Sequence, residues 1–268
     1  IEDLTINNKS GASDNGFNLA GVTADTDLTT TLTISGKGGE LLGLGTNFTN
    51  INGAASTGTI EITAANRTNT AMTFTGGTGG DNVAMESAND VLDAGLGTDT
   101  LNLASNAVLG GFAIDLTSTT DQVTQFAGVS NAAIQKGFEN VSGSGITGSF
   151  GMDVTGTATA NIITGSVAVD IIRGGKGTDT IIQSASVDEL HGGAGADRFT
   201  LSDIFTTTNT TPTIDVIKDF TTGSGGDTFE LSVADIEASG GISQLIGIDA
   251  GGDLDSGDTV ALQTITGA

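Results

Sequence analysis

The sequence predicts an all-β protein, a parallel β-roll or β-solenoid with a β-rich carboxyl-terminal cap. The first observation is a nine-residue unit that repeats without insertion over residues 156–200 and again over residues 76–102. The second is the composition: 42 glycines and one proline among 268 residues, with a hydrophobic fraction of 37%, fit a packed repetitive chain better than a disordered one. The third is the period-two alternation in bursts such as LTTTLTIS at 28–35, which is typical of short strands.

The longer block reads GTATANIIT, GSVAVDIIR, GGKGTDTII, QSASVDELH and GGAGADRFT when it is cut into nines. Positions seven to nine are expected to form a short strand, whose middle side chain points into a core. That eighth position holds a large apolar residue in every copy, namely Ile163, Ile172, Ile181, Leu190 and Phe199. The sixth position always carries an oxygen-bearing side chain, at Asn161, Asp170, Asp179, Asp188 and Asp197.

The shorter block has the same phase. It reads GGTGGDNVA, MESANDVLD and AGLGTDTLN, with Asp81, Asp90 and Asp99 in the sixth position and Val83, Leu92 and Leu101 in the eighth. Nine residues make half a coil, so copies two apart should stack at the strand spacing of roughly 4.7–4.9 Å. The predicted neighbours are therefore Asp81 with Asp99, Asn161 with Asp179, Asp170 with Asp188, and Asp179 with Asp197.

The residue types in these units predict calcium sites. The consensus G-G-x-G-x-D-x-U-x is a signature of calcium-binding parallel β-helices. Its glycines allow positive φ and carbonyls that point inward, and the aspartate adds a carboxylate to an all-oxygen site of the kind Ca²⁺ takes. We predict several Ca²⁺ ions, with metal-site residues Gly77, Gly79, Asp81, Asp90, Gly95, Gly97, Asp99, Asn161, Asp170, Gly175, Gly177, Asp179, Asp188, Gly193, Gly195 and Asp197.

Calcium is predicted to be part of the fold, because rows of like charges without a cation disfavour the compact state. The alternative is a metal-free stack in which these residues only form Asx and glycine turns. That alternative accounts poorly for the fully matching copies. It fits the degenerate copies MESANDVLD and QSASVDELH as well as metal binding does.

Five regions follow from the pattern. Residues 1–75 are a β-rich, solenoid-like region without metal loops, 76–102 the first calcium block, 103–155 an irregular insertion, 156–200 the second calcium block and 201–268 the cap. Strands are expected at 113–116, 152–154 and 259–265, a short helix at 130–138 and a helical turn at 233–238. Asp215, Asp219 and Asp227 fit a further cation site and turn-forming roles equally well.

Charge and composition narrow the function classes. A formal charge of -24, from 32 acidic and 8 basic residues, disfavours nucleic acid and anionic membrane surfaces as partners and suits divalent cations. The absence of cysteine excludes disulfides and thiolate metal sites. No apolar run approaches the roughly 18 residues of a membrane-spanning helix.

Catalysis is not expected from these residues. The chain has one histidine, His191, so neither an H-E-x-x-H zinc site nor a serine hydrolase triad with a G-x-S-x-G elbow is present. His191 occupies the ninth position of a repeat, where a surface residue of a coil is expected. Glycoside hydrolysis is disfavoured because the chain has no tryptophan or tyrosine to form a sugar platform.

The two blocks, together with HGGAGADRF, DVIKDF and GDTFELS between residues 190 and 232, resemble repeats-in-toxin (RTX) proteins of Gram-negative bacteria. The stretches rich in Thr, Asn, Gly and Ala are most similar to surface-layer proteins of alphaproteobacteria. The resemblance implies type I secretion through a carboxyl-terminal signal and folding in extracellular calcium.

The function that this resemblance implies is a structural protein that self-assembles into a lattice or filament on the bacterial cell surface. Cell-surface polysaccharide is a further candidate partner. The alternatives are a calcium-binding export and folding module of a larger secreted enzyme or adhesin, and an adhesin that binds glycans on other cells.

Overall fold

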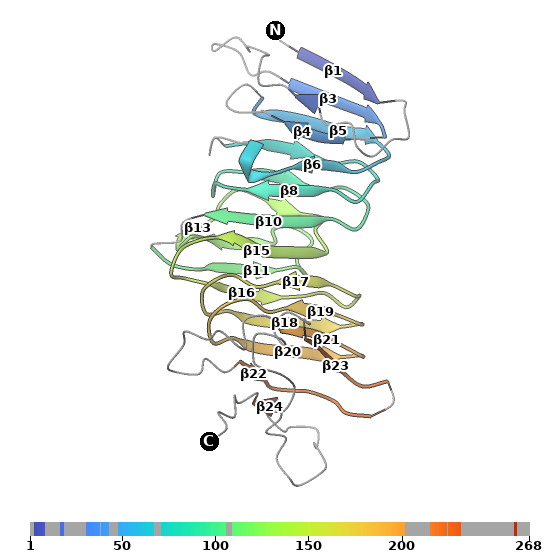
Figure 1. Ribbon diagram of the computed structural model, residues 1–268. Coiled ribbons are helices and arrows are strands. Elements are labelled where there is room, and N and C mark those ends of the chain that lie inside the picture. The colour runs from blue at the N-terminus through green and yellow to red at the C-terminus, as the bar shows by residue number, and fades with distance from the viewer. Residues whose placement is uncertain are drawn as a thin grey trace.

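The structure is a computed structural model that describes residues 3–8, 17–18, 31–37, 39–42, 48–66, 71–105, 109–201, 215–223, 225–231 and 260–261. Strands dominate these residues, and the only helix among them is the short 3-10 helix Ala64–Asn66. The strands stack along one long axis, with the amino-terminal strands at one end and the carboxyl-terminal strands at the other (Figure 1). The prediction of an all-β chain is confirmed.

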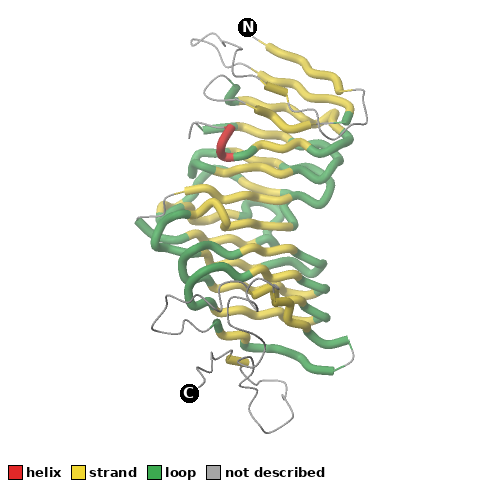
Figure 2. The backbone as a smooth tube through the Cα atoms, viewed as in Figure 1, coloured by secondary structure: helices red, strands yellow, loops and turns green. Residues whose placement is uncertain are grey.

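Three sheets contain the strands, and outside residues 112–136 the chain alternates between the longest sheet and one of the other two. The loops that connect the strands lie along both sides of the stack (Figure 2). The six-stranded sheet consists of β1 (Asp3–Asn8), β3 (Thr31–Gly36), β5 (Asn50–Ser56), β7 (Thr73–Thr75), β9 (Val91–Asp93) and β14 (Gln135–Lys136). The ten-stranded sheet consists of β2 (Phe17–Asn18), β4 (Gly39–Leu42), β6 (Ile60–Ile62), β8 (Asn82–Met85), β10 (Thr100–Ser105), β15 (Asn140–Ile146), β17 (Ile162–Thr164), β19 (Thr180–Ile182), β21 (Arg198–Leu201) and β23 (Thr228–Leu231). The eight-stranded sheet consists of β13 (Val129–Ser130), β12 (Val123–Phe126), β11 (Phe112–Asp115), β16 (Met152–Thr155), β18 (Ile171–Lys176), β20 (Glu189–Ala194), β22 (Val216–Ile217) and β24 (Val260–Ala261).

Within the repeat blocks, strand partners are parallel and lie 18 residues apart. Ile163 pairs with Ile181, and Ile181 pairs with Phe199. The predicted eighth-position core is confirmed, because 0% of the side chain is exposed at Val83, Leu92, Leu101, Ile163, Ile172, Ile181, Leu190 and Phe199. Burial of each such side chain contributes about 1.5–3 kcal/mol, so the column of apolar residues is the main source of stability within the stack.

The region before the first block has the same architecture. In β3, Leu32 and Ile34 are fully buried and alternate with partly exposed residues, which is the period-two pattern of a strand with one face in the core. The strands β5 and β7 pair in parallel and lead into β9 of the first block. This region therefore shares one continuous core with the repeats.

The insertion at 103–155 extends the sheets. The strand β14 pairs with β9, β15 pairs with β10, and β16 pairs with β11. The predicted helix at 130–138 is wrong, because this stretch contains the end of β13 and all of β14. Gln135 is fully buried and pairs with Leu92 at the edge of the six-stranded sheet. A buried sheet edge requires backbone partners, and this requirement outweighs a weak local helix propensity.

The buried side chain of Gln122 forms hydrogen bonds at the junction where the eight-stranded sheet replaces the six-stranded sheet. The six-stranded sheet ends at β14, whereas the eight-stranded sheet begins with the antiparallel strands β13, β12 and β11. The Gln122 amide donates to the carbonyl oxygens of Leu116 at 3.0 Å and Phe138 at 2.8 Å, and its own oxygen accepts from the Phe138 N–H at 3.0 Å. The ten-stranded sheet continues past this junction without interruption.

The segments after the second block continue the stack. The strand β22 pairs with β20, and β23 pairs with β21, so DVIKDF and GDTFELS each supply a strand. Phe220 stacks on Phe229 with a centroid distance of 4.3 Å, and both rings contact Phe199. The predicted helical turn at 233–238 lies outside the described residues. Of the predicted strand at 259–265, only Val260–Ala261 is described, as β24.

Candidate metal centres

The sixth-position side chains lie in the turns, each immediately before or at the start of a strand, and all of them are buried. Their exposed fractions are at most 1% at Asp81, Asp90, Asp99, Asn161, Asp170, Asp179, Asp188 and Asp197. A buried carboxylate is costly unless hydrogen bonds or a cation compensate it. The partners of each oxygen therefore decide which turns could hold a metal.

The first carboxylate oxygen, Oδ1, is satisfied in the same way along the stack. It accepts the backbone N–H of the residue that occupies the equivalent place in the preceding coil. The donor and acceptor residues are Asp81 and Asp99 at 2.6 Å, Asn161 and Asp179 at 2.8 Å, Asp170 and Asp188 at 2.8 Å, and Asp179 and Asp197 at 2.8 Å. All four predicted neighbour pairs are confirmed. Asp90 and Asp170 bind the N–H groups of Met72 at 2.8 Å and Met152 at 2.7 Å instead.

A hydrogen bond within the turn itself divides the turns into two classes. In four turns, which we call closed, a backbone N–H of the same turn donates to the sixth-position side chain. The donor and acceptor residues are Gly77 and Asp81 at 3.4 Å, Glu86 and Asp90 at 3.0 Å, Thr157 and Asn161 at 2.6 Å, and Ser166 and Asp170 at 2.6 Å. In the other four, which we call open, the buried Oδ2 atom has no hydrogen-bond partner within the described chain; these atoms belong to Asp99, Asp179, Asp188 and Asp197.

Backbone conformation follows the same division. Every open turn has a positive φ at its fourth position, at Gly97, Gly177, Gly195 and, without glycine, Ser186 at 90°. Gly95, Gly175 and Gly193 add a positive φ at the second position. Gly77 and Gly79 do not, so the predicted conformation is wrong for this fully matching copy. A Cβ on Gly77 would lie 2.1 Å from the Ser56 carbonyl oxygen, so this glycine approaches the preceding coil as closely as the glycines of the open turns do.

The open turns bring backbone oxygens close to the unpaired carboxylate oxygen. A Cβ built on Gly174 would lie 2.5 Å from Asp179 Oδ2 and 2.6 Å from the Gly192 carbonyl oxygen. A Cβ on Gly192 would likewise lie 2.5 Å from Asp197 Oδ2. In these two open turns glycine at the first position therefore keeps a space near oxygen atoms, as Gly76 does in the closed turn of Asp81, and all-oxygen sites suit hard cations such as Ca²⁺.

Burial makes the charged form of these carboxylates unfavourable. Burial raises the pKa of Asp188 to about 8 and that of Asp99 to about 7, against hydrogen bonds from Asp170 and Asp81 that lower them. Burial also raises the pKa of Asp81 and Asp179 to about 6. Neighbouring carboxylates add to the shift at Asp99, Asp179 and Asp188. A cation among these groups would offset both the burial and the repulsion.

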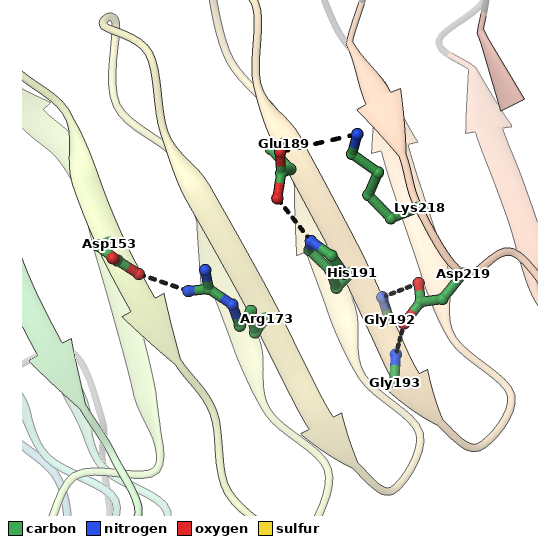
Figure 3. Close-up of polar contacts among 8 residues, drawn as sticks. All are labelled: Asp153, Arg173, Glu189, His191, Gly192, Gly193, Lys218 and Asp219. Atoms are coloured by element: carbon green, nitrogen blue, oxygen red, sulfur yellow. Dashed lines mark hydrogen bonds and ion pairs between the residues drawn. The ribbon is translucent and has the colours of Figure 1, made fainter. Parts of the chain in front are cut away.

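Four acidic residues that the nine-residue pattern does not predict join the array. Asp215 Oδ1 accepts the Asp188 N–H at 2.9 Å, and Asp227 Oδ1 accepts the Asp197 N–H at 2.8 Å. Glu139 Oε2 likewise accepts the Asp99 N–H. Asp219 accepts the N–H groups of the turn glycines Gly192 and Gly193, each at 2.9 Å (Figure 3). These residues lie 26 to 40 positions from their partners, so a search at a period of 18 misses them. Asp215, Asp219 and Asp227 are candidates for a further cation site on their acidic character alone, whereas nothing in the sequence indicates Glu139.

The outer face of the eight-stranded sheet has ordinary surface ion pairs. His191 Nε2 lies 2.9 Å from Glu189, Lys218 lies 3.9 Å from the same residue, and Arg173 binds Asp153 at 2.6 Å (Figure 3). His191 is thus a partly exposed residue on a coil surface, as the sequence predicts. The hydrogen-bond partner of its ring is the Glu189 carboxylate.

The chain matches no protein-family model, and no curated protein sequence matches it. In the described segments, no three His, Cys, Asp or Glu side chains gather at one point as a metal site. Within the same segments, no helix is long and apolar enough to cross a membrane.

Proposed function

We propose that this protein is a calcium-dependent structural protein whose β-roll is completed by Ca²⁺ bound at its open turns. The observation that carries the proposal is the set of four buried, unpaired Oδ2 atoms at Asp99, Asp179, Asp188 and Asp197. Buried polar atoms in folded proteins almost always have a partner. In these turns the nearby groups are carboxylate and carbonyl oxygens, which cannot donate a hydrogen bond but can bind a cation.

Calcium would act here by neutralising charge. The aspartate of each open turn would supply a carboxylate oxygen, and the neighbouring turns would supply carbonyl oxygens. Because the unfolded chain has no such sites, binding would stabilise the folded state by mass action. We expect a dissociation constant per site between the ranges of calcium sensors and of extracellular modules, roughly 10⁻⁵ to 10⁻³ M.

Self-assembly on a bacterial surface is the second part of the proposal. Exposed apolar side chains gather on the turns that lead into the eight-stranded sheet, with Phe150 44% exposed, Val167 48%, Val169 62% and Val187 40%. The register supports a contiguous column, because Val169 and Val187 each lie two residues before the paired residues Ile171 and Glu189. Contiguous apolar patches of this kind mark interaction sites.

The occupant of this column would be a second copy of the chain. A formal charge of -24 opposes association of like molecules, and bound cations would reduce that charge. Calcium would therefore couple folding to the growth of a lattice or filament. This role requires no catalysis, which agrees with the single histidine and its surface ion pair.

A calcium titration followed by circular dichroism and light scattering on one sample tests the proposal. We expect the β signal and the particle size to rise over the same calcium range. The variant Val169→Asp should keep the folding transition and lose the increase in scattering. A chain that folds with calcium but stays monomeric at all concentrations would instead favour an export and folding module. A chain that is fully folded in chelator would overturn the calcium proposal.

A further inference from the structure

We propose that Glu139 is a further ligand of the calcium ion at the open turn of Asp99, at the junction between the two repeat blocks. The inference rests on the proposed function, because it assumes that the open turns bind Ca²⁺. It concerns a residue that lies outside both blocks and has no place in the nine-residue pattern. The site would join the insertion to the upstream coils at the point where the six-stranded sheet ends.

Strand register places Glu139 in the row of sixth-position residues. Thr100 pairs with Asn140, so the residues immediately before them, Asp99 and Glu139, lie side by side in adjacent coils. The Asp99 N–H donates to Glu139 Oε2 at 2.8 Å, the same bond that aspartate Oδ1 accepts elsewhere in the stack. The two residues are 40 positions apart where the repeat would require 18, because the insertion adds 22 residues to this coil.

The unpaired oxygen of Asp99 is the independent sign of a ligand. This residue is 0% exposed, and its Oδ2 has no hydrogen-bond partner among the described residues. Its turn is open, with φ of 94° at Gly95 and 147° at Gly97. The Glu139 carboxylate, at the Asp99 N–H, and the Asp99 carboxylate, at the Asp81 N–H, thus lie in successive coils beside an open turn. The nearby Lys136 is bound to Asp93 at 3.0 Å, and in the described part of the chain no lysine or arginine forms an ion pair with Asp99 or Glu139.

The next coil ends the row, which confines the site to this pair. Val141 pairs with Ile163, and this register places Asn161 beyond Glu139. Asn161 is neutral, its amide donates to the Glu139 carbonyl oxygen at 2.5 Å, and its own oxygen accepts the Thr157 N–H at 2.6 Å. With both ends of its side chain used, Asn161 has no free oxygen to offer. The ion would therefore be bound by Asp99 and Glu139, without a side-chain oxygen from Asn161.

Native mass spectrometry at a series of calcium concentrations tests this site by counting bound ions. In Glu139→Gln, the amide oxygen can still accept the Asp99 N–H, so the strand pairing is kept while the charge is lost. We expect this variant to bind one Ca²⁺ fewer than the wild type. The matched control is Glu230→Gln, which alters an exposed residue paired with Arg198 at 2.7 Å and should keep the full count.

The outcomes separate the two proposals. An unchanged count in Glu139→Gln, with a wild type that binds several ions, would overturn the junction site alone. A wild type that binds no calcium would overturn the proposed function instead. If Glu139→Gln does not fold, Glu139→Asp decides: recovery of folding and of the wild-type count supports the site, and failure to recover them with calcium overturns it.

Discussion

Replacing aspartate by asparagine in an open and in a closed turn should change stability in opposite directions without calcium. Asp179 is the open example and Asp170 the closed one. In Asp179→Asn, the amide oxygen can keep the bond from the Asn161 N–H, which is 2.8 Å long in the wild type. The amide nitrogen would replace an oxygen that has no partner among the described residues and lies near the Gly192 carbonyl oxygen.

The magnitudes follow from these contacts. Asp179→Asn loses no hydrogen bond and gains a donor beside an acceptor, so the calcium-free protein should be about 0.5–1.5 kcal/mol more stable. Asp170 binds the Ser166 N–H at 2.6 Å through one oxygen and the Met152 N–H at 2.7 Å through the other. An amide cannot accept both bonds, so Asp170→Asn should cost about 1.5–3 kcal/mol.

Calcium should reverse the order only for the open turn. At a calcium concentration 100 times the dissociation constant, one lost site removes about 2.7 kcal/mol. Asp179→Asn should then be about 1–2 kcal/mol less stable than the wild type, after its gain of about 0.5–1.5 kcal/mol is subtracted. Asp170→Asn should show the same deficit with and without calcium.

Urea unfolding followed by circular dichroism, in calcium-free buffer and in saturating calcium, measures both differences. The wild type under each condition is the reference. Equal responses of the two variants to calcium would refute the division into open and closed turns. A calcium-free Asp179→Asn that is as destabilised as Asp170→Asn would show that Asp179 Oδ2 has a donor in solution.

Three further predictions concern single groups. The pKa of Asp188 is about 8 and that of Asp99 about 7 in the folded protein, against an ordinary value of 3.8, so calcium-free stability should fall as pH rises from about 4 to 8. Urea midpoints that increase with pH over this range would contradict this. Ser186→Gly should raise the unfolding free energy by about 1 kcal/mol, because it removes a side chain from a φ of 90°; a destabilised variant would refute the strain. Asn161→Asp should lower stability in chelator by about 1–3 kcal/mol, through its lost donor to Glu139, and strengthen the calcium dependence; no change in either would contradict the reasoning.

Periodicity was sufficient to predict the core and the register. The eighth position of a strict nine-residue unit can face only one side of a short strand, so the spacing alone places Ile181 and Phe199 in one column. The pairing of Asp179 with Asp197 follows from the same spacing. These features depend only on the local sequence pattern, and the structure confirms them.

The class of each turn could not be predicted, because its backbone conformation does not follow from its match to the consensus. The copy GGTGGDNVA matches every fixed position, yet its Asp81 lies in a closed turn, in which neither Gly77 nor Gly79 adopts a positive φ. The copy QSASVDELH has no glycine, yet Ser186 adopts positive φ and Asp188 lies in an open turn. The match to the consensus would therefore predict the opposite class for each of these two copies.

Insertions hide contacts from a periodic search for a similar reason. Glu139 lies 40 residues and Asp215 lies 27 residues from the residue whose N–H it accepts, and neither separation is the 18 residues of the repeat. Their sequence neighbours give no sign of the register at which the chain returns. Only the folded arrangement identifies them as members of the carboxylate rows.

The hydrogen bonds between coils give the stack a direction. Each bond to a carboxylate runs from a backbone N–H in one coil to the coil that follows it in the chain, as from Asp179 to Asp197 and from Asp197 to Asp227, whereas backbone bonds such as that from the Arg198 N–H to the Asp179 carbonyl oxygen run the other way. A coil added at the carboxyl-terminal end therefore brings the acceptor that its neighbour needs. For these carboxylate bonds, a coil added at the other end brings only a donor. The two ends of the stack are chemically different growth points, and the carboxyl-terminal coil is the one that completes the coil beside it.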